Sequence, residues 1–312
     1  MKYLDIPGLR MKSSNIIMGC MHLNELNKSE ANTLINNAIE NGINFFDHAD
    51  GYANGLCESL FAEAIDMNDD FREKVIIQSK CGIRKDSPKL RNYYDFSRDH
   101  ILAAVDASLK RLQTDYLDVL LLHRPDALVE PDEVGEAFDR LQASGKVRSF
   151  GVSNQYSLQM ELLQSSLRQK LAFNQVQLSI AHTPLFDAGI TFNMGLPQAI
   201  DRTGGMLEYS RLNNITLQAW SPFQWGMFAG VFLGDYERYE ELNKEIDQLA
   251  EKYAVPAEAI VVAWITSHPA NIQVIIGTTK PERQNNSCLG SEIKLTKEEW
   301  YILYKAAGNP IP

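Results

Sequence analysis

Short hydrophobic runs rich in β-branched residues alternate along the chain with longer segments of helical period. These runs predict eight strands, at Asn15–Met18, Asn44–Ala49, Val75–Lys80, Asp118–His123, Ser149–Ser153, Phe173–Ser179, Ile215–Ser221 and Gln273–Thr278. Their first residues lie 24 to 58 positions apart, whereas strands joined by hairpins recur about every 8–12 residues. The spacing therefore excludes an antiparallel sandwich and favours strand–helix–strand crossovers, which build parallel sheets.

Several of the intervening segments have the periodicity and the end signals of helices. The predicted helices are Glu30–Asn41, Ser97–Leu112, Pro131–Gly145, Glu237–Tyr253, Pro256–Ser267 and Lys297–Ala307. Ser29 and Thr296 are the expected N-caps of the first and last helices, because a side-chain oxygen there accepts a hydrogen bond from the first turn. Gly42 suits the end of the first helix.

Parallel strands alternating with eight or more helices predict an α/β fold, a (β/α)8 TIM barrel, in one domain that covers residues 1–312. We expect extra helices and the active-site loops at the C-terminal face, where such barrels carry their active sites. A doubly wound fold is the weaker alternative. No GxGxxG follows the first strand, and GxxxxGK[ST] does not occur.

Composition and charge narrow the classes of partner. The 312 residues include 30 Lys and Arg against 40 Asp and Glu, a net charge of −10, which argues against a nucleic acid or an anionic membrane as partner. The longest apolar stretch, Ala259–Ile265, is too short to span a bilayer. We expect no signal peptide and a cytoplasmic protein that acts on a small molecule. Both a monomer and a dimer are compatible with this composition.

Four cysteines, Cys20, Cys57, Cys81 and Cys288, are widely spaced and form no CxxC pair. A disulfide scaffold or a structural zinc site would place its cysteines closer together. The sequence therefore predicts free thiols in a reducing compartment.

Reactive side chains recur where consecutive predicted strands end. Asp47, Lys80 and His123 end the second, third and fourth strands, and Tyr52 follows in the second loop. Alone, such residues are commonly a helix cap, a solvated cation or a packed core histidine. Together they fall at the same end of one barrel. A lysine amine inside that end needs a carboxylate partner, because an unpaired buried charge is costly, and Asp47 on the adjacent strand can supply it.

The sequence resembles the aldo-keto reductases over nearly its whole length, and in particular bacterial oxidoreductases of uncertain substrate. The motifs that carry the resemblance are GINFFDHADGYANG (42–55), IIQSKCGI (76–83), LLLHRPD (120–126), GKVRSFGVSN (145–154), FNQVQLS (173–179), QAWSPF (218–223) and IIGTTKPER (275–283). The resemblance implies NADPH-dependent reduction of aldehydes or ketones to alcohols, with Asp47, Tyr52, Lys80 and His123 as the catalytic residues.

The resemblance also implies a role for each of these four residues. Tyr52 would be the general acid, and Lys80 would lower the phenol pKa from its ordinary value near 10. Asp47 would hold Lys80 in place and keep it charged. His123 would donate a hydrogen bond that orients the substrate carbonyl.

The positions that match the family's cofactor contacts extend along the barrel mouth. Asp47 is counted among them. The positions that match contacts to the nicotinamide are Gly19, Cys20, Met21, Ser153, Asn154, Gln175 and Trp220, and Trp220 is the aromatic expected to stack on its ring. The positions that match contacts to the pyrophosphate are Ser221, Phe223 and Gly226.

The last strand leads into the segment that matches the binding site for the adenosine 2′-phosphate. Its residues are Gly277, Thr278, Thr279, Lys280 and Arg283, with Asn286 near the adenine. Arg and Lys suit a dianion because Arg forms paired hydrogen bonds and Lys adds a compact charge. Gly277 stands where many members of the family have a phosphate-binding lysine. The two cations lead us to expect a preference for NADPH. The glycine in place of the lysine leaves NADH as a weaker possibility.

The substrate side of the site is less defined in the sequence. We expect the substrate pocket to be lined by His22, Tyr52, His123, Trp225 and Phe228, beside Phe223. We expect the loop Arg84–Asp95 to cover this pocket. An open, aromatic-lined mouth predicts broad acceptance of small carbonyl compounds.

Two other functions remain as alternatives at this point. One is a nicotinamide-binding sensor or regulatory subunit with negligible turnover. The other is a metal-dependent hydrolase that uses His48, Asp50, His123 and His182. The second is disfavoured because His48 and Asp50 do not form an HxH pair, so we expect no metal.

Overall fold

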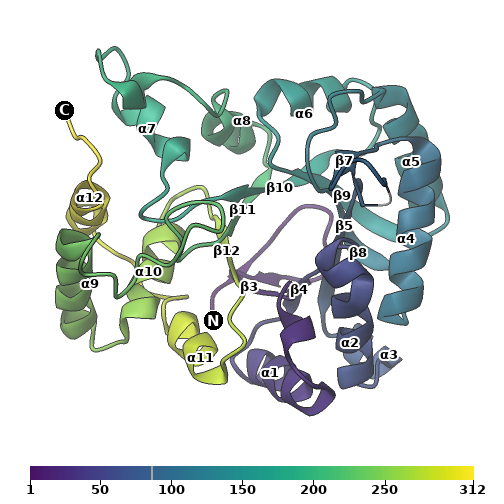
Figure 1. Cartoon of the computed structure of the whole chain (residues 1–312), viewed down its shortest axis with the longest axis horizontal. Helices are drawn as coiled ribbons and strands as arrows, with labels where there is room; N and C mark the ends of the chain where they lie inside the picture. Colours follow the sequence, from purple (N-terminus) through teal and green to yellow (C-terminus); the bar gives the residue numbers. More distant parts are fainter. Residues whose placement is uncertain (86) are drawn as a thin grey trace.

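The computed structural model describes residues 1–85 and 87–312. Its centre is a closed barrel of parallel strands in the order β10-β11-β12-β3-β4-β5-β8-β9 (Figure 1). The barrel strands are β3 (Ile16–Gly19), β4 (Phe45–Asp47), β5 (Ile76–Cys81), β8 (Leu117–Leu122), β9 (Val147–Ser153), β10 (Leu171–Gln177), β11 (Thr216–Trp220) and β12 (Gln273–Ile276). Each predicted strand overlaps one of these, and the (β/α)8 barrel is confirmed.

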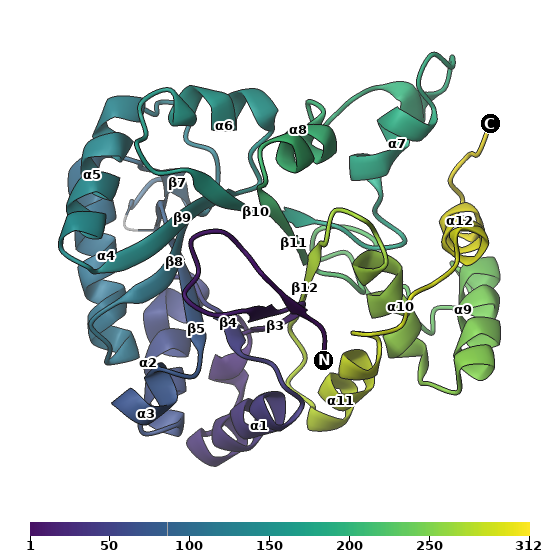
Figure 2. The ribbon, with the colours of Figure 1, turned by 180° about the vertical axis from the view of Figure 1, so that it is seen from behind.

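Helices surround the barrel, as Figures 1 and 2 show from opposite sides. They are α1 (Lys28–Glu40), α2 (Leu56–Ala64), α3 (Asp69–Arg72), α4 (Arg98–Leu112), α5 (Pro131–Ala143), α6 (Ser157–Gln164), α7 (Pro184–Ile190), α8 (Met206–Leu212), α9 (Glu240–Tyr253), α10 (Ala257–Thr266), α11 (Pro281–Leu289) and α12 (Lys297–Ala306). Short 3-10 helices lie at η1 (Leu23–Glu25), η2 (Tyr52–Gly55) and η3 (Pro197–Ala199).

The helix ends confirm one predicted cap and correct another. Thr296 caps α12 in a capping box with Glu299. Ser29 does not cap α1, because the helix begins earlier. The side chain of Asn27 accepts from the Glu30 N–H, and the Glu30 carboxylate accepts from the Asn27 N–H, so this reciprocal pair fixes the start.

Side chains alternate between the barrel interior and its outer surface along each strand, as the period of two requires. Phe45 on β4 and Ile76 on β5 belong to the cluster inside the barrel. Phe46 and Ile77 pack in the larger cluster that joins the strands to the helices. The same alternation points Asp47, two residues after Phe45, into the barrel mouth.

An N-terminal hairpin that the sequence did not reveal closes the other end of the barrel. Its strands, β1 (Tyr3–Leu4) and β2 (Ser13–Ser14), pair antiparallel. Leu4 and Ile6 join the apolar cluster inside the barrel, and Figure 2 shows this segment crossing the barrel end. The interior is therefore apolar at this end, which leaves the opposite end for polar groups.

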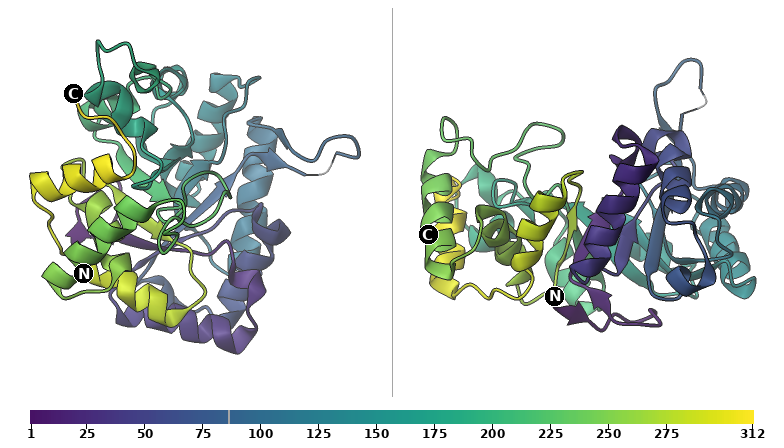
Figure 3. Two further views of the ribbon diagram at one scale, coloured as in Figure 1. Left: turned by 60° about the vertical axis from the view of Figure 1, so that its left-hand side comes forward. Right: turned by 90° about the horizontal axis from the view of Figure 1, so that it is seen from below.

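A second hairpin, β6 (Ile83–Arg84) with β7 (Tyr93–Tyr94), projects from the body of the molecule (Figure 3). It lies in the predicted covering loop Arg84–Asp95, of which Asp86 is outside the described residues. Among all the residues that the structure describes, no helix is both long enough and apolar enough to cross a bilayer.

The close packing of α11 on α10 provides a test of the fold. A Cβ at Gly290, at the end of α11, would lie 2.2 Å from the Ala259 carbonyl oxygen. We expect Gly290→Ala to lower the free energy of unfolding by about 1–3 kcal/mol, because overpacking forces the backbone apart. Urea-induced unfolding measures this change.

Gly195→Ala is the matched control, since a Cβ there meets nothing within 4 Å. Its effect is expected to stay within about 0.5 kcal/mol. Equal unfolding midpoints for the two variants would contradict the close contact of the two helices.

Candidate active site

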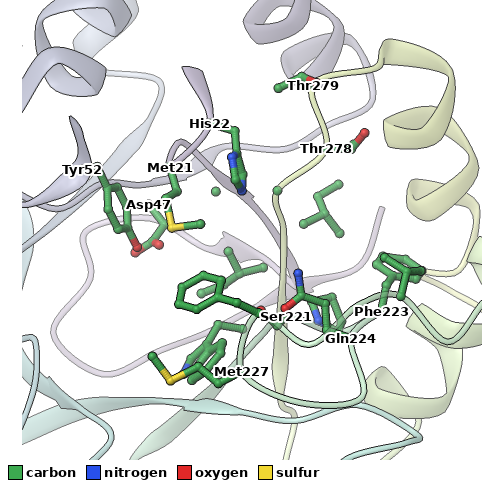
Figure 4. A pocket seen from close by; sticks show the side chains of 18 of the residues that line it. Met21, His22, Asp47, Tyr52, Ser221, Phe223, Gln224, Met227, Thr278 and Thr279 are labelled. Atoms are coloured by element: carbon green, nitrogen blue, oxygen red, sulfur yellow. The ribbon is translucent and has the colours of Figure 1, made fainter. Parts of the chain in front are cut away.

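A cavity of about 1090 Å³ opens at the C-terminal ends of the barrel strands (Figure 4). Asp47 ends β4, and Tyr52 lies in the loop that follows; both line one part of the cavity. Thr278 and Thr279, in the loop after β12, line another part, away from Tyr52 in Figure 4. The cavity is thus an elongated space built from loops that follow several strands.

The fully buried amine of Lys80 lies at the centre of the polar groups in the barrel mouth. Its Nζ donates to Asp47 Oδ2 at 2.8 Å, to the His48 carbonyl oxygen at 2.9 Å and to Tyr52 Oη at 2.8 Å. Burial lowers the pKa of Lys80, but Asp47 and Tyr52 raise it by more, so its net pKa lies above the usual value. Lys80 is therefore charged at neutral pH.

The second carboxylate oxygen of Asp47 is held by two glutamine amides. Asp47 Oδ1 accepts from Gln78 Nε2 at 2.6 Å and from Gln175 Nε2 at 3.0 Å. Gln175 is on β10, four strands away from β4 in the closed barrel, so this hydrogen bond crosses the barrel interior. With Lys80 on the other oxygen, the carboxylate has partners on both sides.

A chain of amides continues from these residues toward the N-terminal hairpin. Gln78 Nε2 and Gln175 Nε2 also approach Gln218 Oε1, at 3.0 and 3.2 Å. Gln218 Nε2 donates to Gln273 Oε1 at 3.1 Å, and Gln273 Nε2 donates to Ser13 Oγ at 2.7 Å. All of these side chains are buried, so the network gives polar groups in the barrel interior partners that water cannot supply.

The loop that presents Tyr52 has an unusual backbone. Ala53 and Asn54, directly after Tyr52, have positive φ angles of 46° and 54°. This region is sparsely populated by residues other than glycine, and by alanine in particular. The turn sets the phenol against two groups of the mouth: Lys80 Nζ lies 4.7 Å from the ring centroid, and the His123 ring packs edge-on at 5.9 Å.

The acidity of Tyr52 differs from the expectation drawn from sequence. Burial is the largest influence and raises the pKa of Tyr52 to about 12; Lys80 lowers it in part, and Asp47 raises it. The predicted direction of the Lys80 effect holds, but a net lowering of the pKa is wrong for this structure, because burial disfavours the phenolate more strongly. The phenol is therefore protonated at neutral pH.

His123 is neutral in this site. Burial, together with the charges of Lys80 and Arg124, lowers the pKa of His123 well below its ordinary value. His48 is not part of the cavity lining: its ring packs against Phe61, and burial lowers its pKa to about 3. Among residues 1–85 and 87–312, no group of three or more His, Cys, Asp or Glu side chains is arranged to hold a metal ion.

Polar side chains beside Tyr52 and His123 are held in fixed orientations. Trp220 Nε1 donates to Asn154 Oδ1 at 3.0 Å, and Asn154 Nδ2 donates to Ser153 Oγ at 2.8 Å. Ser153 Oγ in turn donates to the Gln175 carbonyl oxygen at 2.9 Å. These four residues lie on β9, β10 and β11 or, for Asn154, directly after β9, and all line the cavity.

The far part of the cavity is lined by Gly277, Thr278, Thr279, Lys280 and Arg283. They lie in the loop after β12 and at the start of α11. In the described part of the chain, no carboxylate lies within 4 Å of the Lys280 amine or the Arg283 guanidinium. The residues that the sequence predicts to bind a phosphate therefore lie together, and none of the carboxylates that the structure describes is paired with them.

The sequence model of the Aldo/keto reductase family matches residues 15–307. The chain belongs to the aldo/keto reductase family. It is 36% identical to the uncharacterized oxidoreductase YcsN of Bacillus subtilis over 310 residues, covering 97% of each chain. It is 35% identical to the oxidoreductase YdhF of Escherichia coli over 305 residues, covering 96% of this chain and 95% of YdhF. These matches confirm the predicted family and its bacterial oxidoreductase branch.

A further relative has a name that states its substrate. The 6-dehydroglucose reductase of Agrobacterium fabrum is 30% identical over 307 residues, covering 96% of this chain and 95% of that enzyme. A crystal structure of the thermostable aldo-keto reductase Tm1743 with the inhibitor epalrestat superposes with a TM-score of 0.77 at 24% identity, over 98% of this chain and all of that one. That likeness supports the fold, while the family and its relatives support an oxidoreductase of carbonyl compounds.

Most predicted contact residues of this aldo/keto reductase lie at the cavity. Gly19, Met21, His22, Ser221, Phe223 and Phe228 line it, together with the residues described above. Four of the predicted contact residues lie outside the lining, namely Cys20, Trp225, Gly226 and Asn286, and so does the predicted catalytic residue Lys80, which is buried behind Tyr52.

Each of these four residues has its own local contacts. Cys20 is fully buried in the core. The Trp225 indole lies against Gly230 and under the Arg238 guanidinium, 4.8 Å from its ring centroid. A Cβ at the neighbouring Gly226 would lie 3.0 Å from the Ala229 Cβ. Asn286 Nδ2 approaches Oε2 of the lining residue Glu258 at 3.4 Å.

Other lining residues are not named individually by the sequence analysis, although Lys85, Asn92 and Tyr94 fall in the loop that it expects to cover the site. They include Ile83, Lys85, Asn92, Tyr94, Arg124, Gln224 and Met227. Only Arg124 had a local signal, since it directly follows His123 at the end of a barrel strand. The rest come from hairpin and loop segments whose direction no periodic pattern gives.

The buried ion pair at the barrel mouth generates a stability prediction. Lys80→Met leaves the Asp47 carboxylate buried without its counter-ion. We expect the free energy of unfolding to fall by about 3–5 kcal/mol, the usual cost of an uncompensated buried charge. Urea-induced unfolding at pH 7 measures this fall.

The double variant Lys80→Met/Asp47→Asn removes both charges and keeps an acceptor for the glutamine amides. It is expected to recover a large part of the lost stability. If the double variant is as unstable as the single one, the loss arises from packing rather than from the charge.

Proposed function

We propose that this aldo/keto reductase reduces aldehydes and ketones to alcohols with NADPH, and that residues 1–312 act as one domain. The observation that carries the proposal is the chain from Asp47 through Lys80 to Tyr52, which ends at the cavity beside a neutral His123. A protonated phenol with a fixed cation behind it is suited to giving a proton to a carbonyl oxygen. Free thiols at all four cysteines fit the expected cytoplasmic location.

The cavity suits a dinucleotide in size and in the chemistry of its two parts. Its volume of about 1090 Å³ lies slightly above the range of about 300–1,000 Å³ typical of small-molecule sites. Ser153, Asn154 and Gln175 would surround the nicotinamide, with Trp220 against its ring. Lys280 and Arg283, which lack acidic partners in the described chain, would bind the 2′-phosphate of NADPH.

The reaction then divides between the cofactor and the chain. When bound, the reduced nicotinamide supplies the hydride to the carbonyl carbon. Tyr52 Oη gives its proton to the carbonyl oxygen, and the charge on Lys80 stabilises the phenolate that remains. Asp47 keeps Lys80 charged and in place. His123, as a neutral imidazole, donates a hydrogen bond to the same oxygen and orients the substrate.

Removing the Tyr52 hydroxyl tests this assignment. We expect Tyr52→Phe to lower kcat for the NADPH-dependent reduction of an aromatic aldehyde by about 10²–10⁴-fold, the usual contribution of a general acid. NADPH binding should be retained, because the change removes a proton donor and not the cavity. The measurements are NADPH oxidation at 340 nm and a titration of NADPH binding.

Tyr301→Phe is the matched control, since Tyr301 is 44% exposed on α12, and it should retain wild-type kcat. Equal activity of Tyr52→Phe and the wild type would contradict the acid role. NADPH binding without reduction of any carbonyl by the wild type would favour the sensor alternative instead.

The preference for NADPH is tested at the other end of the cavity. Arg283→Gln removes a guanidinium that has no acidic partner among the described residues. We expect the Kd for NADPH to rise about 10-fold or more, the size of a hydrogen bond to a charged group, and the Kd for NADH to change little. Isothermal titration with both cofactors measures this, and an equal effect on both would remove Arg283 from the 2′-phosphate site.

A further inference from the structure

Besides Lys280 and Arg283, the cavity has two more basic residues, which lie at its substrate end. Arg124 directly follows His123 in the loop between β8 and α5, and Lys85 lies in the β6–β7 hairpin. Both line the cavity. Lys85 Nζ donates to the carbonyl oxygen of Gly51, the residue before Tyr52, at 2.7 Å. The two cations therefore lie at the end where the carbonyl group would react.

Arg124 has neutral surroundings. Its Nη2 lies 3.9 Å from Met227 Sδ, and its guanidinium carbon lies 5.7 Å from the centroid of the Trp220 ring. Burial lowers the pKa of Arg124, although Tyr94 and Tyr52 raise it in part. The described residues of the site thus disfavour the charge on the guanidinium and provide no anion for it.

The acidic side chains that the structure describes at this end of the cavity are already paired. Asp47 is bound by Lys80 at 2.8 Å, and Glu25 is bound by His22 at 2.7 Å. Within the described ranges 1–85 and 87–312, no carboxylate lies within 4 Å of the Arg124 guanidinium.

Other inward-packed arginines of this protein do have such partners. Arg72 binds Asp118 at 2.7 Å, and Arg111 binds Glu58 at 2.7 Å. A half-buried guanidinium that faces a cavity without a carboxylate is therefore an exception in this fold. The desolvation cost of this guanidinium charge is offset if a bound ligand carries an anionic group that pairs with it.

We propose that Arg124 is an anion-binding residue of the substrate site, and that the preferred carbonyl substrates carry a carboxylate. This inference rests on the proposed reductase function. The planar guanidinium can form two parallel hydrogen bonds with one carboxylate, which favours this group over a phosphate that would need further cations. The carbonyl group would then lie at Tyr52 and His123, and the carboxylate at Arg124.

The experiment compares charged and neutral aldehydes of similar shape. The kcat/KM with NADPH is measured for 4-carboxybenzaldehyde against 4-formylbenzamide, and for 4-oxobutanoate against its methyl ester. The wild type is expected to prefer the carboxylate by about 10- to 100-fold in at least one pair, the size of a hydrogen bond to a charged group. The kcat/KM for 4-formylphenyl phosphate is measured in the same way, to compare a phosphate with a carboxylate.

Two variants and one control separate recognition from structure. Arg124→Gln should bring the carboxylate-to-neutral ratio of kcat/KM close to one, through a rise in KM for the carboxylate substrates. Arg124→Lys should restore part of the ratio. Arg168→Gln, at an arginine that is 85% exposed, should leave it unchanged.

Several results would overturn the proposal. These are equal rates for the charged and neutral aldehydes in the wild type, a ratio that survives Arg124→Gln, or an equal loss of both activities, which would make Arg124 structural. A preference for the phosphate over the carboxylate would overturn the choice of anion.

A binding readout keeps this proposal separate from the reductase function. If no carbonyl compound is reduced, the proposed function fails, and the subsite is judged by thermal shift with NADPH and terephthalate, which cannot be reduced. Stabilisation of the wild type by terephthalate but not by terephthalamide, and its loss in Arg124→Gln, would support the subsite. No stabilisation of the wild type would overturn it.

Discussion

The buried pair of Lys80 and Asp47 is the interaction on which the barrel mouth depends. Placing two charges in a protein interior costs more desolvation energy than their attraction returns, unless every remaining donor and acceptor is satisfied. Here the lysine amine has three acceptors, and the carboxylate has amide donors on its other oxygen. The pair is therefore a costly feature that the surrounding structure is built to support, and its result is a fixed cation behind Tyr52.

That support extends down the barrel axis. Gln78, Gln175, Gln218 and Gln273 come from four different strands and hydrogen bond to one another inside the barrel. The hydrogen bonds from Gln78 to Gln218 and from Gln175 to Asp47 join opposite strands, so they also fix the shape of the barrel around Asp47. Apolar side chains fill the end beneath them, where the N-terminal hairpin excludes water. A rigid polar layer on an apolar base holds the mouth in one geometry.

The strands and the loops contribute differently to this aldo/keto reductase. Strand ends supply the ion pair and His123, whose positions follow from the regular register of the barrel. The loops and the β6–β7 hairpin supply Lys85, Arg124 and Met227, which set the charge and shape of the substrate end. Under the proposed function, the reacting groups and the groups that contact the substrate thus come from different parts of the fold.

The sequence alone determined the barrel and the place of its reactive residues. Alternation of hydrophobic runs with helical segments is a local signal, and it gave the number and order of the strands. A strand's period of two, with its end marked by a polar residue, then placed Asp47, Lys80 and His123 at one rim. The early start of α1 at Asn27 was missed because Ser29 offers an equally good cap locally.

Only the tertiary structure decided which groups meet across the barrel and how strongly each is desolvated. The contact between Gln175 and Asp47 joins residues that are 128 positions apart, so no local pattern encodes it. The pKa of Tyr52 follows from burial exceeding the effect of Lys80, a balance that depends on all the surrounding atoms. The directions of Trp225 and Arg124 follow from loop backbones that have no period. The local pattern of hydrophobic residues indicates which side of a helix or strand is buried. The hydrogen-bond partners of a side chain and its dielectric environment are set only when the whole chain folds.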